Sequence, residues 1–403
     1  MREQRWPAAA GALAALASLV LASACGGAAS SQGTVQNGGA TAPGVTGDAI
    51  QIGTSNALTG INATAAGQVS SGAQAVFDSV NAAGGIDGRK VQVNLLDDAY
   101  DATRAVANAR TFVNKPVFAV FGGLGTVAAE AVRPLYEQEG IPYLFPYQGD
   151  VWQTNPSTFL LMPFYSNQTK TIIKGTLALH GKGSVYALFG KTAGTAQSIV
   201  DARTATEQSG GTFLGYDEVS QGTADYTPYV LRMKAAHPDY LIISTTQADS
   251  ARYATAVVAQ GALPARRILG LVTLADETFV GAIPQEAADL VSAVAPNSPP
   301  ASSQAAECAG LVRKYQPSAR VTMDAIWGCA SAQLLVYGLR KAGANLTRTA
   351  LQKAFEQMRD VNVTPALPPV TFTGSNHQAE RTMYEFTVKN RQLVVGNQVT
   401  VSS

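Results

Sequence analysis

The stretch VFAVFGGLGTVAAEAV, residues 117–132, contains an apolar segment, a glycine-rich turn and a helical segment. Residues 117–121 are predicted to form a strand, and Thr126 is placed to cap the helix that follows. The glycines between them let the backbone approach another group closely. Free N–H groups at a helix start favour an anion or a carbonyl oxygen. The stretch therefore predicts a binding site for a small polar group.

The same stretch contains a sequence pattern of nucleotide-binding domains. Residues 123–128 fit G-x-G-x-x-A, the dinucleotide fingerprint. In a Rossmann domain that fingerprint follows the first strand, whereas two strand–helix units precede it here. The position argues against an NAD or FAD site, so no cofactor is expected. A nucleotide-dependent enzyme is kept only as an alternative.

Strand and helix patterns alternate on both sides of this stretch. Strands are predicted at 49–54, 91–96 and 141–145, and helices at 67–83, 101–113 and 127–139. A second series contains helices at 167–179, 196–208, 227–236 and 250–260 and strands at 185–189, 213–219, 240–244, 268–272 and 290–294. Helices at 303–315, 324–342 and 347–358 are expected to return to the first series, and segments 370–372 and 384–389 to extend the second as a β-ribbon. This alternation predicts an α/β fold with two doubly wound lobes.

The first 47 residues have the composition of a targeting segment and a tether. Arg2 and Arg5 precede an apolar Ala/Leu-rich run, so residues 1–24 are predicted to be a signal peptide. Small residues before Cys25 are similar to a bacterial lipobox, which makes Cys25 the expected lipidated N-terminus. Cleavage near Ala24 as an ordinary signal peptide is the alternative. Residues 25–47 are predicted to be a flexible, lipid-anchored linker. We expect an exported protein anchored to the outer face of the cytoplasmic membrane, or a periplasmic one.

Charge and cysteine content exclude several classes of function. The 403 residues include 29 Lys and Arg and 28 Asp and Glu, so no basic excess favours nucleic acid. Cys308 and Cys329 form an even pair in an exported chain and are expected to form a disulfide, with two buried free thiols as the alternative. His180, His237 and His377 lie far apart and are expected in loops or at the surface. No spacing of Cys or His indicates a metal site.

Several ordered segments resemble one protein family. They are ALTG at 57–60, NAAGGIDGRKVQVNLLDDAYD at 81–101, GGLGT at 122–126, EGIPYLFP at 139–146, ADYTPYVLRMKAAHPDYLI at 224–242 and AQGALPARRILG at 259–270. Across residues 48–395 the chain resembles the solute-binding proteins of branched-chain amino acid ABC transporters, which have the type I periplasmic-binding fold. The resemblance implies two α/β lobes joined by three crossings, which close around a small ligand and deliver it to permease subunits. It also implies a monomer.

The resemblance and the element pattern together predict the domain organisation. Lobe 1 is expected to contain residues 48–162 and 296–369, and lobe 2 residues 163–295 and 370–403. The three crossings between them are expected near 162–164, 295–297 and 367–369. Hinge bending at these crossings would open and close the protein.

The ligand site is expected in the loops that follow the strands, because ligands of doubly wound sheets lie outside the carboxyl ends of the strands. By the resemblance, Gly123 and Thr126 hold a carboxylate or carbonyl group of the ligand, although Thr126 can also be a plain helix cap. No catalytic residue is predicted. The expected ligand-binding residues are Leu58, Thr59, Gly123, Leu124, Thr126, Pro146, Tyr147, Gln148, Lys191, Thr192, Thr246, Gln247 and Thr273.

Two departures from the amino-acid binders of the family bear on the ligand. Residues 192–194 read Thr-Ala-Gly where those proteins usually have Tyr-Gly, and residues 245–247 read Thr-Thr-Gln where they often have an acidic residue. A buried cation without a partner is costly. The sequence therefore favours a ligand that is neutral or carries only a carboxylate, such as an aromatic acid or a short amide, with Tyr147 placed to stack on it.

Three functions follow from these observations. The leading one is a non-enzymatic solute-binding protein of an ABC importer. A ligand sensor or regulator on the same fold is the second. An enzyme is the third, and the chain contains neither G-x-S-x-G nor H-E-x-x-H to favour it.

Overall fold

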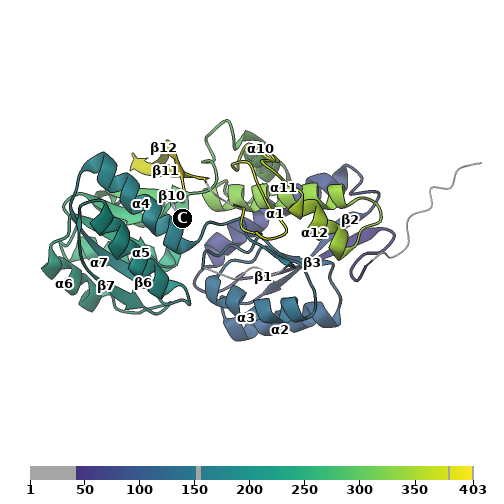
Figure 1. Ribbon diagram of the computed structural model, residues 1–403, viewed down its shortest axis with the longest axis horizontal. Coiled ribbons are helices and arrows are strands. Elements are labelled where there is room, and N and C mark those ends of the chain that lie inside the picture. Colours follow the sequence, from purple (N-terminus) through teal and green to yellow (C-terminus); the bar gives the residue numbers. More distant parts are fainter. Residues whose placement is uncertain (1–41, 151–155, 380–381, 402–403) are drawn as a thin grey trace, which may run out of the picture. The chain divides into compact units, whose positions relative to one another are not determined.

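The structure, a computed structural model, describes residues 42–150, 156–379 and 382–401 (Figure 1). The predicted signal peptide, Cys25 and all but the last few residues of the predicted linker lie outside the described residues. None of the helices in the described part is long and apolar enough to cross a membrane.

The first sheet has five parallel strands in the order β2-β1-β3-β4-β5. These are β1 (Ala49–Asn56), β2 (Lys90–Asp97), β3 (Ala119–Phe121), β4 (Tyr143–Leu144) and β5 (Thr158–Phe159). The helices between them are α1 (Ala63–Ala82), α2 (Ala102–Asn114) and α3 (Thr126–Gln138). Figure 1 shows α2 and α3 on one face of this sheet and α1 on the other. β5 was not predicted, because a two-residue strand leaves no pattern in the sequence.

The second sheet has seven strands in the order β12-β11-β10-β9-β8-β6-β7. These are β6 (Ser184–Gly190), β7 (Thr212–Val219), β8 (Tyr240–Ser244), β9 (Arg267–Gly270), β10 (Val291–Ala295), β11 (Thr382–Lys389) and β12 (Gln392–Thr400). β6 to β10 pair in parallel, and the hairpin of β11 and β12 pairs antiparallel with β10. Its helices are α4 (Tyr165–His180), α5 (Thr195–Gln208), α6 (Thr227–Ala236), α7 (Gln247–Ala259), α8 (Glu277–Ala282) and α9 (Gln285–Ala288).

Two local predictions for this part of the chain were wrong, and three elements were not predicted. The strand expected at 268–272 ends at Gly270, and a 3-10 turn follows at Val272–Leu274. Residues 370–372 form no strand, since Val370 makes only an isolated bridge to Val361. β12 and the short helices α8 and α9 were not predicted. In β12 nearly every side chain is exposed, so the strand lacks the alternation of apolar and polar residues by which strands are recognised.

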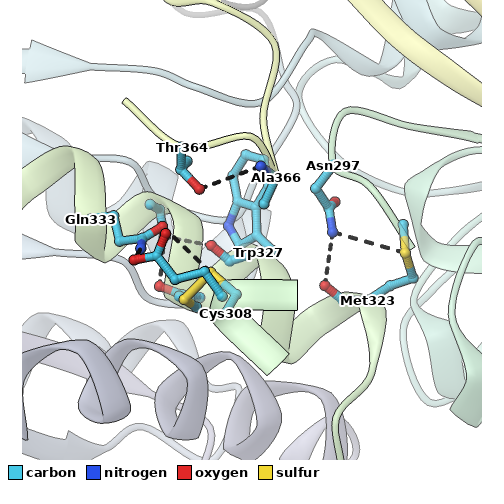
Figure 2. Close-up of a disulfide and its surroundings, with 11 residues drawn as sticks. Asn297, Cys308, Met323, Trp327, Gln333, Thr364 and Ala366 are labelled. Atoms are coloured by element: carbon cyan, nitrogen blue, oxygen red, sulfur yellow. Dashed lines mark hydrogen bonds between the residues drawn. A yellow bond between two sulfur atoms is a disulfide. The ribbon is translucent and has the colours of Figure 1, made fainter. Parts of the chain in front are cut away.

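The helices α10 (Ala306–Tyr315), α11 (Met323–Ala342) and α12 (Arg348–Glu356) return to the first sheet, as expected. α10 and α11 pack along α1, and α12 packs on α11. The predicted disulfide between Cys308 and Cys329 is confirmed and joins α10 to α11 (Figure 2). One helical layer of this lobe therefore combines α1 from the first part of the chain with α10, α11 and α12 from its last third. The disulfide links two of these helices.

The chain passes between the two sheets three times, after β5, after β10 and before β11. The first and third passages are hydrogen-bonded side by side, from Leu160 N to the His377 carbonyl at 2.8 Å and from Ala379 N to the Leu160 carbonyl at 3.0 Å. The second passage is tied to α11, because Asn297 Nδ2 donates to the Met323 carbonyl at 3.0 Å (Figure 2). The predicted fold of two doubly wound α/β lobes with a three-crossing hinge is confirmed.

One histidine lies where the sequence did not place it. His377 is buried in the third passage, with its ring stacked on Phe159 at 4.0 Å between centroids. Its Nε2 lies 3.2 Å from the Glu356 carboxylate. His377 thus lies in a loop, one of the two locations expected for the histidines, but this loop is buried because aromatic packing draws it into the core.

Candidate functional site

A cavity of about 860 Å³, part of it open to solvent, lies where loops from the two lobes meet. The first lobe contributes the turn after β3, residues Tyr147 and Asp150, and the start of α1. The second lobe contributes the loops after β6, β8 and β9, and Asp324 at the start of α11 completes the lining. All of these strand ends are carboxyl ends, which is where a doubly wound sheet binds its ligand.

The cavity brings together eight of the thirteen side chains predicted to bind ligand. Those eight are Leu124, Thr126, Tyr147, Lys191, Thr192, Thr246, Gln247 and Thr273. The remaining five, which do not line it, are Leu58, Thr59, Gly123, Pro146 and Gln148.

Leu58 and Thr59 are held by a carboxylate at the end of β2. Both backbone N–H groups donate to Asp97 Oδ1, at 2.9 and 3.2 Å, and the Thr59 hydroxyl donates to Oδ2 at 2.7 Å. These hydrogen bonds, with that of the Thr59 hydroxyl the strongest, lower the pKa of Asp97 to about 2. Asp97 therefore organises this loop as a permanent anion.

Gly123, Pro146 and Gln148 lie behind the lining and position it. The Gly123 carbonyl accepts from Tyr147 N at 2.8 Å, and the Pro146 carbonyl accepts from Gln148 N at 2.9 Å. Gln148 Oε1 in turn accepts from Asp150 N at 2.7 Å. Gly123 has φ +84°, a conformation that strains any other residue.

Thr126 is the first residue of α3 and not its cap, so the capping prediction was wrong. The N-cap position is occupied by Gly125, with φ +131° and no side chain to satisfy the helix N–H groups. Thr126 is 4% exposed, and its side chain is hydrogen-bonded to the Tyr165 phenol. The start of α3 therefore presents N–H groups without a side-chain cap at the wall of the cavity.

Asp324 is a lining residue that the sequence reasoning missed. It is 2% exposed; its Oδ1 accepts from the Tyr147 hydroxyl at 3.0 Å and its Oδ2 from Gln247 Nε2 at 3.4 Å. Burial, followed by the charge of Asp276, raises the pKa of Asp324 well above its ordinary value. Residues 245–247 are neutral, as the sequence shows, but α11 supplies an acidic group beside Gln247 from far along the chain.

Two further acidic side chains lie next to Asp324, at the start of α8. Asp276 Oδ2 accepts from Asp324 N at 3.2 Å, and Glu277 Oε2 accepts from Met323 N at 3.0 Å. Burial and the charge of Asp276 raise the pKa of Glu277 to about 7. Since α8 belongs to the second sheet and α11 packs on the first lobe, these hydrogen bonds join the two lobes.

A second carboxyl pair joins the lobes at the start of α5. Asp150 accepts from Gly194 N at 3.2 Å. Burial and a hydrogen bond with Asp150 raise the pKa of Glu130 to about 7, and Glu130 is also hydrogen-bonded to the backbone at Ala193. No pattern in the sequence indicated this pair, because Glu130 lies on α3 and Asp150 in a loop beyond β4, and the two carboxyls meet only in the fold.

Aromatic rings form much of the rest of the lining, from Tyr100, Tyr147, Tyr165 and Phe189. Burial raises the pKa of Tyr165 to about 12 and that of Tyr147 well above the ordinary value, so both phenols stay neutral. Tyr147 is stacked on Trp327 with 5.3 Å between ring centroids. One face of the ring predicted to stack on a ligand is thus already covered.

The turn that fits the dinucleotide fingerprint does not follow the first strand of the chain. The turn follows β3, which lies between β1 and β4. Among the described residues, no group of three or more His, Cys, Asp or Glu side chains is arranged to hold a metal ion.

Three comparisons with known proteins agree on the fold. A family model described as periplasmic binding protein matches residues 49–392. A Leu/Ile/Val-binding protein homolog from Brucella melitensis is 23% identical over 317 residues, 77% of this chain and 84% of the relative. A fatty acid ABC transporter substrate-binding protein from Thermomonospora curvata has a TM-score of 0.80 at 20% identity, over 91% of this chain and 96% of that one.

A further structural relative was solved with an aromatic ligand. It is an ABC transporter solute-binding protein from Rhodopseudomonas palustris in complex with 3,4-dihydroxy benzoic acid, with a TM-score of 0.77 at 19% identity, over 88% of this chain and 98% of that one. At these identities the structural likeness shows the fold alone. The ligands named for the three relatives differ, so they do not assign one to this chain.

Proposed function

The chain belongs to the periplasmic binding protein family, and we propose that it is an extracytoplasmic solute-binding lipoprotein that delivers a small molecule to an ABC importer. The observation that carries this proposal is the cavity whose walls come from both lobes. A ligand that touches both walls binds the closed conformation more tightly than the open one, so it shifts the population toward closure. Permease subunits would distinguish the two conformations. The protein acts as a monomer and catalyses no reaction.

The binding site of this proposal consists of the eight predicted residues that line the cavity. The uncapped N–H groups at the start of α3 and the Thr126 hydroxyl hold a carboxylate or carbonyl group of the ligand. Lys191, Thr192, Thr246, Gln247 and Thr273 contact the ligand from the second lobe. The ligand class covers amino-acid-like compounds, amides and aromatic acids.

The lobes of this proposal are residues 48–162 with 296–369, and 163–295 with 370–403. The packing of Phe372 supports one refinement. Its ring contacts Phe159 and Phe355 of the first lobe, at 5.2 and 6.1 Å between centroids. Residues 370–376 are therefore assigned to lobe 1, and the third crossing to residues 377–379, which pair with the first passage.

Residues 1–24 direct export in this proposal, and a lipid on Cys25 anchors the chain, with residues 25–47 as a tether. A Cys25→Ser variant should appear in the soluble extracytoplasmic fraction, whereas the wild-type chain remains with the membrane. Equal distribution of the two proteins would exclude the lipid anchor and leave the binding function untouched.

Small-angle scattering tests the binding mechanism. The full chain is first screened by thermal shift against amino acids, ω-amino acids, amides, aromatic acids and fatty acids. A ligand present at a hundred times its Kd adds about 2.7 kcal/mol to the free energy of unfolding. The scattering radius should then fall when the stabilising compound is added. Stabilisation without compaction would contradict closure, and no stabilisation by any of these classes would contradict the proposed function.

A further inference from the structure

Tyr147 connects two chemically different ends of the cavity. Its backbone belongs to the glycine turn, since Tyr147 N donates to the Gly123 carbonyl at 2.8 Å and its carbonyl accepts from Gly125 N at 3.3 Å. Its hydroxyl donates to Asp324 Oδ1 at 3.0 Å. The glycine turn before α3 and the Asp324 carboxyl are thus separated by the length of a tyrosine side chain.

The Asp324 end is acidic without a cation of its own. The hydrogen-bond partners of its carboxyl are the neutral Tyr147 and Gln247, and the other acidic groups next to it are Asp276 and Glu277. Among the described residues, none of these three carboxyls has a Lys, Arg or His within ion-pair distance. Arg320 acts on Glu277 only at longer range. An unpaired carboxylate is unfavourable when buried, which is why the pKa of Asp324 is raised; a positive charge in the cavity would pair with the carboxylate and offset that cost.

An independent feature of the lining also favours a hydrogen-bond donor. Asn62 is at the N-cap of α1, is 4% exposed and lines the cavity, yet its side chain does not cap the helix. Its Oδ1 has no donor within the part of the chain that the structure describes, and the hydroxyls of Thr245 and Thr273 there have no partner either. Buried acceptors without donors destabilise a protein, and a ligand with several N–H groups would satisfy them.

We propose that the ligand carries a protonated amine bound by Asp324, separated by several bonds from a carboxylate or carbonyl group held at the start of α3. In an α-amino acid both groups are attached to one carbon, too close together to reach both ends of Tyr147. The class that fits is an ω-amino acid or an amino amide. Asp324 is then the residue that selects for the amine. This inference rests on the proposed function, because it assigns the ligand of the same cavity.

Calorimetric titration of the full chain tests this inference. The probes are the unbranched ω-amino acids from 3-aminopropanoate to 6-aminohexanoate, the carboxylic acids of matching length, and leucine. At least one ω-amino acid should bind at least tenfold more tightly than leucine and than its matching acid. Asp324→Asn keeps the shape of the side chain and an acceptor but removes the charge. It should weaken binding of that ω-amino acid at least tenfold and leave the matching acid unchanged.

Proton release distinguishes a bound amine from mere packing. Without a ligand, Asp324 and Glu277 bind protons because their pKa values are raised. An ammonium group in the cavity favours the ionised carboxylates. The hydrogen bond that the Tyr147 hydroxyl donates favours the carboxylate of Asp324 as well. Binding of the ω-amino acid should therefore release protons and strengthen as the pH rises from 6 to 8. Asp276 and Arg320 are the other charged side chains that act on Glu277. Titration in two buffers of different ionisation enthalpy measures the release. Asp324→Asn should reduce it.

Asp360→Asn is the matched control, since it removes the same charge from an exposed position. It should bind all probes like the wild-type chain. The inference is overturned if no ω-amino acid binds, if leucine binds more tightly than all of them, or if Asp324→Asn binds them as well as wild type does. If only leucine or a carboxylic acid binds and compacts the protein, the proposed function is supported and this inference is wrong. No binding by any compound class would remove both.

Discussion

The close crossing of α1 and α11 gives a sharp test of how this fold is packed. A Cβ added at Gly328 would lie 1.9 Å from the Val69 carbonyl oxygen, and one added at Gly72 would lie 1.9 Å from the Ala325 carbonyl oxygen. Ordinary contacts begin near 3.4 Å, so Gly328→Ala requires the helices to separate by about 1.5 Å. Both clashes are with backbone, which has no rotamer to change.

Gly328→Ala should therefore destabilise the protein by about 3 kcal/mol, the upper end of the usual cost of overpacking. It should also weaken ligand binding, because Asp324 lies one turn away on the same helix. Urea unfolding followed by circular dichroism measures the first effect, and titration with the best probe measures the second.

Gly310→Ala is the matched control in a neighbouring helix. A Cβ at Gly310, within α10, meets no atom within 4 Å. Alanine there should stabilise the protein by about 0.5–1 kcal/mol through helix propensity alone. If Gly328→Ala and Gly310→Ala change stability by the same amount and sign, the reasoning from backbone contact is refuted.

Three further predictions concern pH, the disulfide and the aromatic packing of Phe372. Glu277 has its folded pKa raised from 4.5 to about 7, so the folded state binds more protons between these values. The contribution of Glu277 to the free energy of unfolding, about 3 kcal/mol, is complete below pH 4.5 and is lost as the pH rises through 7. In urea unfolding curves, Glu277→Gln should abolish this loss of stability. Replacing Cys308 and Cys329 by Ala together should cost about 3 kcal/mol by the same measurement, for a sequence separation of 21 residues. Phe372→Ala should cost about 3–5 kcal/mol in thermal unfolding, since Phe372 packs edge-on to Phe159.

Each of these has a control. Glu286→Gln, exposed on α9, should leave the pH dependence unchanged. A reducing agent should destabilise the wild-type chain and not the double alanine variant. Phe372→Leu should recover most of the loss. An unaltered pH dependence in Glu277→Gln, or equal stability with and without the disulfide, would contradict the respective argument.

Strand and helix types followed closely from local patterns. The predicted helix at 227–236 and strand at 240–244 match α6 and β8 residue for residue. Their signals lie within the segment itself, as periodicity and turn residues. The elements that were missed, such as β5 and α9, are too short for periodicity to appear. The family resemblance is confirmed by a match that spans most of the chain.

The residues that line the cavity also fall into predicted and unpredicted ones. Thr126, Tyr147 and Thr246 were predicted because they follow strands, and the carboxyl ends of strands meet at one edge of a parallel sheet. Asp324 and Asn62 were not, because each is at the start of a helix that no strand-end rule places at the cavity.

The sequence alone was sufficient to predict the two α/β lobes and most of the strand ends that line the cavity, and it favoured a disulfide over two free thiols. These depend on local periodicity and on the small number of ways in which strands and helices connect. Only the tertiary structure decided the charge of the cavity. Gln247 and Asp324 are 77 positions apart, yet their side chains are 3.4 Å apart across the two lobes. The electrostatic field at a site is the sum over groups near in space, and no local pattern in a sequence contains that sum.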